Sequence, residues 1–156
     1  MHDLLNSEGL RMLAQPRWFF LLFILGWVVV SAVLGHLSGW ATLAASFRAE
    51  KTIDGERFRF LSGSIGKRFL PVSYSNCLFV TVGSQGLYLS ILFPFRMGSP
   101  PLFVPWAAVQ EVTQKRYFMV RNTALVIKDH WPRITLRGGV GDAIQRAFAA
   151  AHPKKP

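Results

Sequence analysis

The most apolar stretch of the chain covers residues 18–37, with the sequence WFFLLFILGWVVVSAVLGHL. No Asp, Glu, Lys or Arg interrupts it, and as a helix it spans about 30 Å, the thickness of a bilayer's hydrocarbon core. Trp18 and Trp40 bracket it at the spacing of interfacial aromatic belts. The pattern predicts a single transmembrane helix over 18–37, after an N-terminal tail over 1–17. A cleaved signal peptide and a buried core helix are the alternatives, but the stretch is long for the first and the chain is small for the second.

Small residues form a stripe along one face of this predicted helix. Ser31, Gly35 and Gly39 recur every four residues. Small residues at this spacing let two helices pack closely. Self-association through the stripe is therefore an open alternative.

The segment that follows, residues 38–51, predicts a short amphipathic junction helix. Its apolar positions recur at i, i+3, i+4 and i+7, and they are Trp40, Leu43, Ala44 and Phe47. Such a helix lies either in a membrane interface or against the domain that follows. Both interpretations stay open at this point.

From residue 52 the apolar period changes to that of strands. Seven runs rich in β-branched and aromatic residues are separated by turn residues, over 57–63, 76–83, 86–93, 101–106, 111–120, 123–129 and 132–138. In the third run, alternate positions give one apolar face, made of Leu87, Leu89, Ile91 and Phe93. A helical period then returns over 140–151, and residues 153–156 form a basic tail. The sequence predicts a mainly β fold, in which seven antiparallel strands form a barrel closed by a C-terminal helix over 52–152.

This layout resembles the pleckstrin-homology-like (PH-like) and GRAM-like domains of bacteria. The resemblance is most suggestive in the stretch GLYLSILFPFRMGSPPLFVPWAAV, where Pro105 and Trp106 stand where those domains often end their fourth strand. The whole chain is similar to small proteobacterial membrane proteins that carry such a domain. The resemblance implies a barrel with one end plugged by the C-terminal helix, and it implies no particular chemical activity.

The charge of the chain narrows the choice of partners. The chain of 156 residues has 18 Lys and Arg against 8 Asp and Glu, a net charge of +10, and the excess lies beyond residue 37. A cationic domain favours an anionic membrane surface, a nucleic acid or an acidic protein. Aromatic residues alternate with basic ones as they do in strands, which makes nucleic acid the weaker choice. We expect a bacterial inner (plasma) membrane location with the basic domain in the cytoplasm.

The candidate contacts with lipid headgroups or a partner are basic and apolar residues at strand ends. They are Lys67 and Arg68 between the first two strands, Phe95, Arg96 and Met97 after the third, and Lys115 and Arg116 on the fifth.

No pattern in the sequence indicates catalysis. The four histidines and the single Cys77 lack metal-ligand spacing, and no nucleotide-binding or nucleophile motif occurs. We therefore expect no enzyme, no metal and no cofactor. The expected function is a membrane-anchored PH-like module that contacts the bilayer, its anionic headgroups or a membrane-protein partner. The alternative is an accessory subunit or stability factor of a membrane protein complex, docking through the transmembrane helix and the barrel groove.

Overall fold

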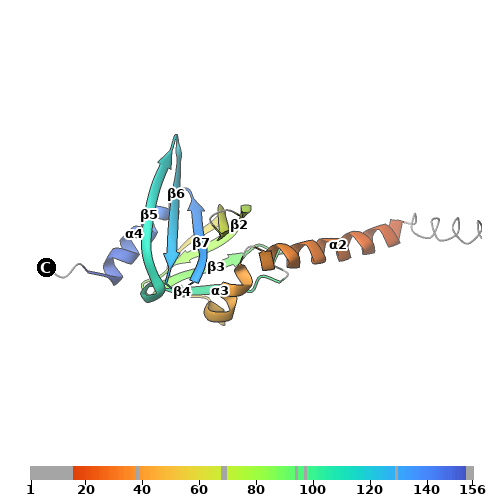
Figure 1. Cartoon of the computed structure of the whole chain (residues 1–156), viewed down its shortest axis with the longest axis horizontal. Coiled ribbons are helices and arrows are strands. Elements are labelled where there is room, and N and C mark those ends of the chain that lie inside the picture. Colours follow the sequence, from red (N-terminus) through yellow and green to blue (C-terminus); the bar gives the residue numbers. More distant parts are fainter. Residues whose placement is uncertain are drawn as a thin grey trace, which may run out of the picture.

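A long helix leads into a curled sheet in the computed structural model, which describes residues 16–37, 39–67, 70–93, 95–96, 98–128 and 130–153 (Figure 1). The helices and strands, in chain order, are α2 (Pro16–Leu37), α3 (Trp40–Phe47), β1 (Glu56–Lys67), β2 (Leu70–Val82), β3 (Gly86–Ile91), β4 (Leu102–Pro105), the 3-10 turn η1 (Trp106–Ala108), β5 (Val109–Tyr117), β6 (Val120–Ile127), β7 (His130–Arg137) and α4 (Val140–Ala151).

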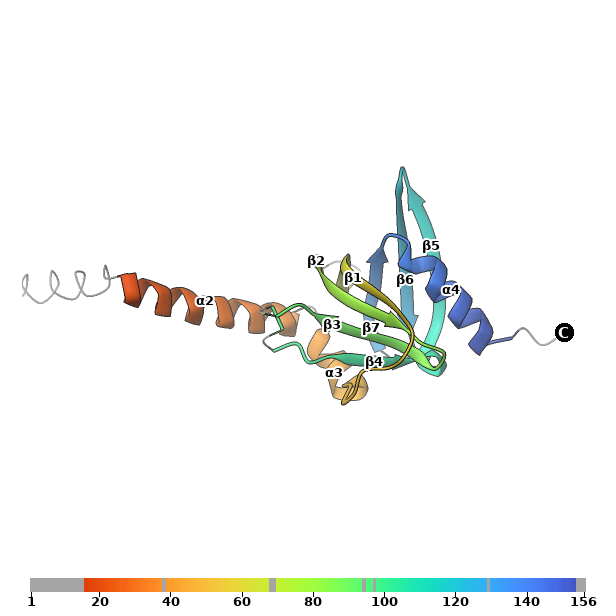
Figure 2. The ribbon, with the colours of Figure 1, turned by 180° about the vertical axis from the view of Figure 1, so that it is seen from behind.

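The seven strands form one antiparallel sheet with the order β4-β3-β2-β1-β7-β6-β5. Strand β1 is central, because it pairs with β2 on one side and with β7 on the other. The sheet curls, and α4 lies beside the half that holds β5, β6 and β7 (Figure 2). The prediction of a mainly β fold with seven antiparallel strands and a C-terminal helix is confirmed. The predicted closed barrel is not observed, because the strands form a curled sheet whose edge strands β4 and β5 do not pair with each other in the described part of the chain.

Alternation along the strands directs one set of side chains into the core. Leu87 and Leu89 of β3 are fully buried, and Ile91 is nearly so. Phe93, which the alternation placed on the same face, is 76% exposed. The strand ends at Ile91, so the period of two no longer applies to Phe93 in the turn that follows.

A bulge in β1 turns the side chain of Phe60 outward. The pairing of β1 with β2 shifts between Phe58 and Leu61, and Phe60 has a φ of 56°. Phe58 packs against the core, whereas Phe60 is exposed and its ring lies 5.4 Å from that of Phe79. An extra residue in one strand reverses the facing of the next, which the sequence alternation does not reveal.

The junction helix is shorter than predicted and packs against the sheet. Helix α3 contacts β4 and β7, and its Trp40 and Leu43 are fully buried. The Trp40 indole Nε1 donates a hydrogen bond of 2.7 Å to the carbonyl oxygen of Pro100. Of the two interpretations for this segment, docking on the domain is the one observed.

The prediction of a transmembrane helix over 18–37 is wrong. In the part of the chain that the structure describes, no helix combines the length and the apolar character needed to cross a membrane. The expectations of a single-pass membrane protein and of a transmembrane docking face are therefore not supported.

Candidate functional site

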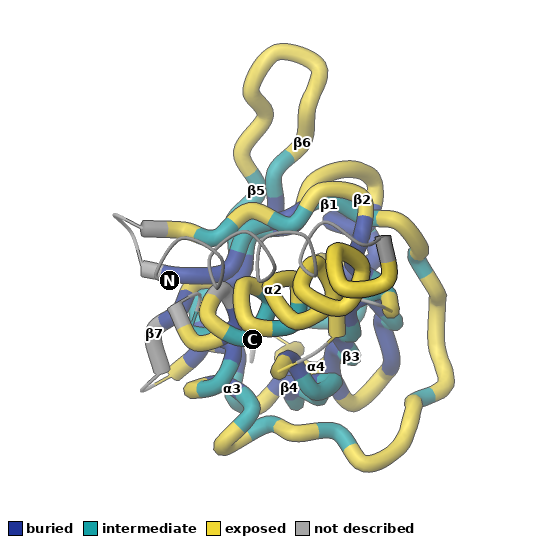
Figure 3. Tube along the Cα trace, turned by 90° about the vertical axis from the view of Figure 1, so that its right-hand side faces the viewer, coloured by how far each residue is buried: buried dark blue, intermediate teal, exposed yellow. Residues whose placement is uncertain are grey.

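Among the described residues, the most exposed apolar side chains lie at the tip of the hairpin formed by β5 and β6. The two strands pair up to Tyr117 and Val120, so Phe118 and Met119 form the turn. Phe118 is 100% exposed and Met119 is 92% exposed. The hairpin extends well beyond the rest of the sheet, and its end is exposed (Figure 3).

The backbone at this tip is strained at Phe118. Phe118 has a φ of 53°, in the left-handed region that glycine and asparagine occupy more easily. A bulky residue in this region costs of order 1 kcal/mol. Turns between two paired strands usually carry Asn, Asp or Gly for this reason. The tip therefore holds a large apolar side chain at a position where folding alone favours a small or polar one.

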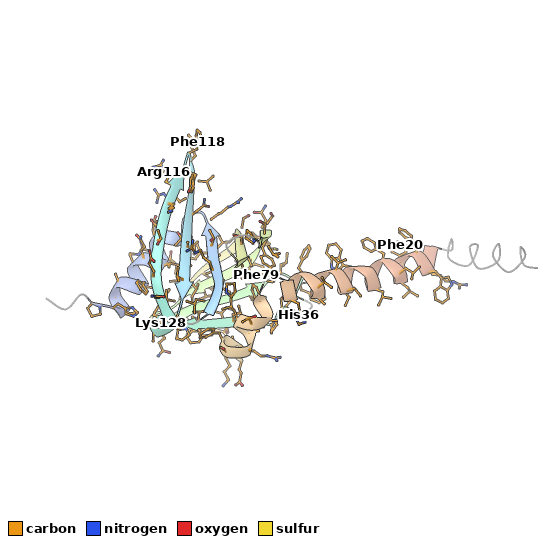
Figure 4. All side chains as sticks on the ribbon, in the orientation of Figure 1. Phe20, His36, Phe79, Arg116, Phe118 and Lys128 are labelled. Carbon is orange, nitrogen blue, oxygen red and sulfur yellow. The ribbon has the colours of Figure 1, made fainter. Side chains whose placement is uncertain are left out.

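Basic side chains surround the base of this apolar tip. Arg116 of β5 lies directly opposite Arg121 of β6. Like charges in such a pair destabilise a sheet. Arg121 is compensated by Asp142 of α4, at 2.7 Å, and the Nε of Arg116 donates a hydrogen bond of 3.2 Å to the carbonyl oxygen of Phe118. Arg116 and Phe118 lie close together at the end of the hairpin (Figure 4). Lys115, the remaining basic residue, is exposed beside Arg116.

A cavity of about 520 Å³ lies between this hairpin and the bulged part of β1 and β2. Its lining residues are Phe60, Leu61, Ser62, Asn76, Met119, Val120, Arg121, Arg137, Gly138 and Gly139. The cavity therefore continues from the apolar tip down to the end of β7.

The candidate contacts at the first hairpin are only partly described. Lys67 is the last residue of β1, and its side chain lies outside what the structure describes. Arg68 and Met97 lie outside the described residues altogether. Their expected contacts stay predictions.

Phe95 and Arg96, the other candidates in the break after β3, have different surroundings. The ring of Phe95 packs against that of Trp27 in α2, with 5.1 Å between centroids. Arg96 is exposed and lines a separate cavity with Arg48 and Lys51. Phe95 is thus partly used inside the molecule, whereas Arg96 stays open to a ligand.

The two tryptophans predicted as membrane anchors lie in different environments, and the stripe of small residues packs inside the molecule. Trp18 is 45% exposed on α2, but Trp40 is a core residue and is unable to serve in an interfacial belt. Gly35 is buried against Gly98 and Ser99, and Gly39 lies next to Pro132. Ser31 lines a small cavity with Gly35 and Ser99. The stripe packs against this chain's own loop and strand β7.

Sequence reasoning found Lys115 and Arg116 but missed the turn beside them. The sequence predicts one strand over 111–120, because Tyr117 and Phe118 favour strands and no Gly, Asn or Pro marks the turn. The available signal was the symmetry of KRYFMVR, in which apolar residues lie between basic ones.

The remaining chemistry of the described residues is limited. They contain no group of three or more His, Cys, Asp or Glu side chains placed to hold a metal ion. Cys77 is buried in β2, and burial raises the pKa of its thiol, so the thiol is poorly nucleophilic at neutral pH. The Cys77 environment favours a packing role.

Comparison of the chain with protein-family models gives no match. Comparison with curated proteins gives no similar sequence either. We therefore infer the function from the geometry of the β5–β6 hairpin and its cavity.

Proposed function

We propose that this protein is a non-catalytic, PH-like module that contacts an anionic membrane surface through the β5–β6 hairpin. The observation that carries the proposal is the fully exposed Phe118 and Met119 at the tip, with Lys115, Arg116 and Arg121 at its base. The sheet order and the C-terminal helix support the PH-like assignment.

The energetics of such a contact favour a surface with both apolar and anionic parts. Burying a Phe or Met side chain contributes about 1.5–3 kcal/mol. Each Lys or Arg near an anionic leaflet adds about 1 kcal/mol. The two contributions are of similar size, so binding through this hairpin should require the bilayer's apolar interior and its charge together. The strain at Phe118 is consistent with a side chain that is retained for contact.

Flotation of the full-length protein with vesicles tests this function. The protein is mixed with neutral phosphatidylcholine vesicles and with vesicles that also contain an anionic phospholipid, across a salt series. We expect the anionic vesicles to bind more protein, and the excess to fade as salt rises. Binding that does not depend on lipid charge is common to both vesicle types, so the ratio between them isolates the charged contact.

Two pairs of substitutions make the test specific to the hairpin. Lys115→Gln with Arg116→Gln should lower the anionic-to-neutral ratio by about tenfold or more, from about 1 kcal/mol for each charge. The control, Arg57→Gln with Arg59→Gln, removes two exposed charges from β1. An equal loss in both variants, or a ratio near one for the unmodified protein, would contradict the proposal.

A second candidate function is that of an accessory subunit that docks on a partner protein through α2. Helix α2 exposes large apolar side chains around its whole circumference, which include Trp18, Phe19, Phe20, Leu21, Leu22, Phe23, Ile24 and Leu25. A helix that is apolar on all sides is stable when other apolar groups cover it. A photo-crosslinking residue at Phe20 should then capture one defined protein in cells, whereas the same residue at Phe118 should not (Figure 4). Capture of lipid alone from both positions would reject this candidate.

A further inference from the structure

The cavity below the hairpin tip is lined by hydrogen-bond donors and apolar groups, without a carboxylate among its ten lining residues. The guanidinium groups of Arg121 and Arg137 contribute positive charge. The Asn76 side-chain oxygen accepts a hydrogen bond of 2.9 Å from the Ser62 hydroxyl, which leaves the Asn76 amide nitrogen as a donor. A donor-rich wall of this kind suits an anion that accepts several hydrogen bonds.

The residues that line the cavity carry a net charge close to +1 when the ion pair of Arg121 is taken into account. Arg121 is neutralised by its ion pair with Asp142. Arg137 has no ion pair in the described part of the chain. One uncompensated guanidinium matches a ligand group with a single negative charge, such as a phosphodiester. A headgroup with several phosphates would need more cations than this wall supplies.

Unusual backbone conformations are concentrated on the same cavity. Phe60, Asn76 and Gly138 all line it, and their φ values are 56°, 53° and 99°. Non-glycine residues in this region are uncommon and tend to occur at ligand sites. The bulge that turns Phe60 outward gives the cavity its aromatic wall.

The depth of the cavity fits the thickness of a lipid headgroup layer. Arg121 pairs with Arg116, two residues below the turn of Phe118 and Met119, and Arg137 pairs with Asn122, one residue further. At 3.4 Å per residue these positions lie about 7–10 Å below the tip. When apolar side chains insert about 5–10 Å into the headgroup and acyl boundary, groups at this distance reach the phosphates.

We propose that this cavity binds the phosphodiester headgroup of a singly charged phospholipid, of the phosphatidylglycerol class. This inference rests on the proposed function, since the hairpin must bring the cavity to the bilayer. Arg137 holds the phosphate with a two-pronged hydrogen bond, and the Asn76 amide supplies a further donor. Phe60, Met119 and Val120 contact the glycerol and the first methylene groups.

The test uses the full-length protein in a non-ionic detergent, with the methyl groups of methionine labelled for NMR. The Met119 signal is assigned by Met119→Leu, and dihexanoyl-phosphatidylglycerol is added below its micelle concentration. We expect a saturable shift of that signal in the unmodified protein and in Arg133→Gln. Arg137→Gln should weaken binding by about tenfold, because a hydrogen bond to a charged group is lost. Arg133 is the matched control, since it is an exposed arginine of the same strand outside the cavity.

Titrations with other ligands show whether the phosphodiester that binds belongs to a lipid or to a free headgroup. Glycerophosphoglycerol, the headgroup without acyl chains, should bind at least tenfold more weakly than the short-chain lipid. Equal binding of the two would overturn the assignment to a lipid. Tighter binding of an inositol polyphosphate would overturn the single-charge argument. No saturable shift, or equal weakening in Arg137→Gln and Arg133→Gln, would overturn the site.

The failure of this inference is distinguishable from failure of the proposed function. If vesicles bind through Lys115 and Arg116 but Met119 does not respond to the lipid, the cavity proposal alone is wrong. If Met119 responds but flotation shows no dependence on vesicle charge, the surface-binding function is wrong and the cavity is a site for single lipid molecules.

Discussion

Gly141, in the first turn of α4, lies directly against the side-chain hydroxyl of Thr123 in β6. A Cβ atom at position 141 would overlap the Thr123 Oγ1 and crowd the Nε2 of Gln114. The absence of a side chain at this position lets the helix approach the sheet closely. Val140 and Ile144, on either side of Gly141, are fully buried as a result.

We predict that Gly141→Ala destabilises the fold by about 1–3 kcal/mol, the usual cost of overpacking. Alanine is the better helix former by about 1 kcal/mol, so a pure helix-propensity effect would have the opposite sign. Urea unfolding measures the difference. Gly139→Ala is the matched control, because a Cβ at Gly139 meets nothing within 4 Å. A Gly141→Ala variant as stable as the control would show that α4 moves to make room.

The hydroxyl below Gly141 gives a related prediction. The Oγ1 of Thr123 and the Nε2 of Gln114 are both buried without a hydrogen-bond partner among the described residues. Thr123→Val replaces the hydroxyl with a methyl group of similar size, so we expect no loss of stability and a gain of up to about 1 kcal/mol. A loss of more than 1 kcal/mol in urea unfolding would indicate that the hydroxyl is hydrogen-bonded in solution.

Most of the sheet could be predicted from the sequence because its alternation is strong. Leu87 and Leu89, for example, occupy the buried positions that a period of two requires. Local rules failed where tertiary structure changes the backbone. The bulge at Phe60 reverses the facing of β1, and the burial of Trp40 depends on Pro100, 60 residues away. The apolar stretch 18–37 is helical as expected, but apolar character alone did not establish that it crosses a membrane.

The candidate site was predictable only in its basic part. Lys115 and Arg116 stand out in a sequence because of their charge. The turn at Phe118 contains none of the residues that usually mark a turn, so the sequence predicts a continuous strand at this position. The cavity joins residues from β1, β2, β6 and β7, and its lining follows from strand pairing that no single stretch encodes.

Phe118→Asn should raise stability and lower membrane binding at the same time. Asparagine tolerates the φ of 53° better than phenylalanine does, so we expect a gain of about 1 kcal/mol in urea unfolding. Loss of the exposed ring that would insert into the bilayer should reduce binding to vesicles by about tenfold or more. Phe93→Asn removes an exposed ring from a turn away from the hairpin and is the control for binding. Unchanged flotation of Phe118→Asn beside a normal Phe93→Asn would exclude the tip as a contact.

Asp142→Asn should strengthen the binding of anionic vesicles. Asp142 neutralises Arg121 at the cavity, so its removal adds one positive charge there. We expect an increase of about fivefold in the anionic-to-neutral ratio, from about 1 kcal/mol for a charge near the surface. The ion pair is half exposed, so the loss of stability should stay within about 1 kcal/mol. Glu56→Gln, which breaks the ion pair with Arg146, adds the same charge elsewhere. An equal increase in both variants would show that vesicle binding depends only on the net charge of the protein, and not on the charge at the cavity.

The buried thiol of Cys77 should make the stability of the fold depend on pH in the alkaline range. Burial raises the pKa of its thiol in the folded protein above that in the unfolded chain. The folded state therefore holds the proton more tightly, and this contribution to stability is complete below the ordinary thiol pKa of about 8.5 and is lost as pH rises through the raised value. Unfolding of the native protein and of Cys77→Ala, compared between pH 7 and pH 10, should show the difference shrinking above the ordinary pKa. A difference that stays constant or grows with pH would contradict this assignment.

The contact between α2 and the loop after β3 distinguishes internal packing from self-association. A Cβ at Gly98 would lie 3.5 Å from that of Ala32, within the range that a disulfide bridges, although the φ of 78° at Gly98 strains a cysteine there. Ala32→Cys with Gly98→Cys should form a disulfide within one chain, seen as a faster-migrating monomer on a non-reducing gel. The stripe of Ser31 and Gly35 lies beside this contact, so pairing of two copies through the stripe would displace the loop. Ala32→Cys alone is the control, and it should stay monomeric. A disulfide-linked dimer in both variants would show that α2 packs against a second copy of the chain.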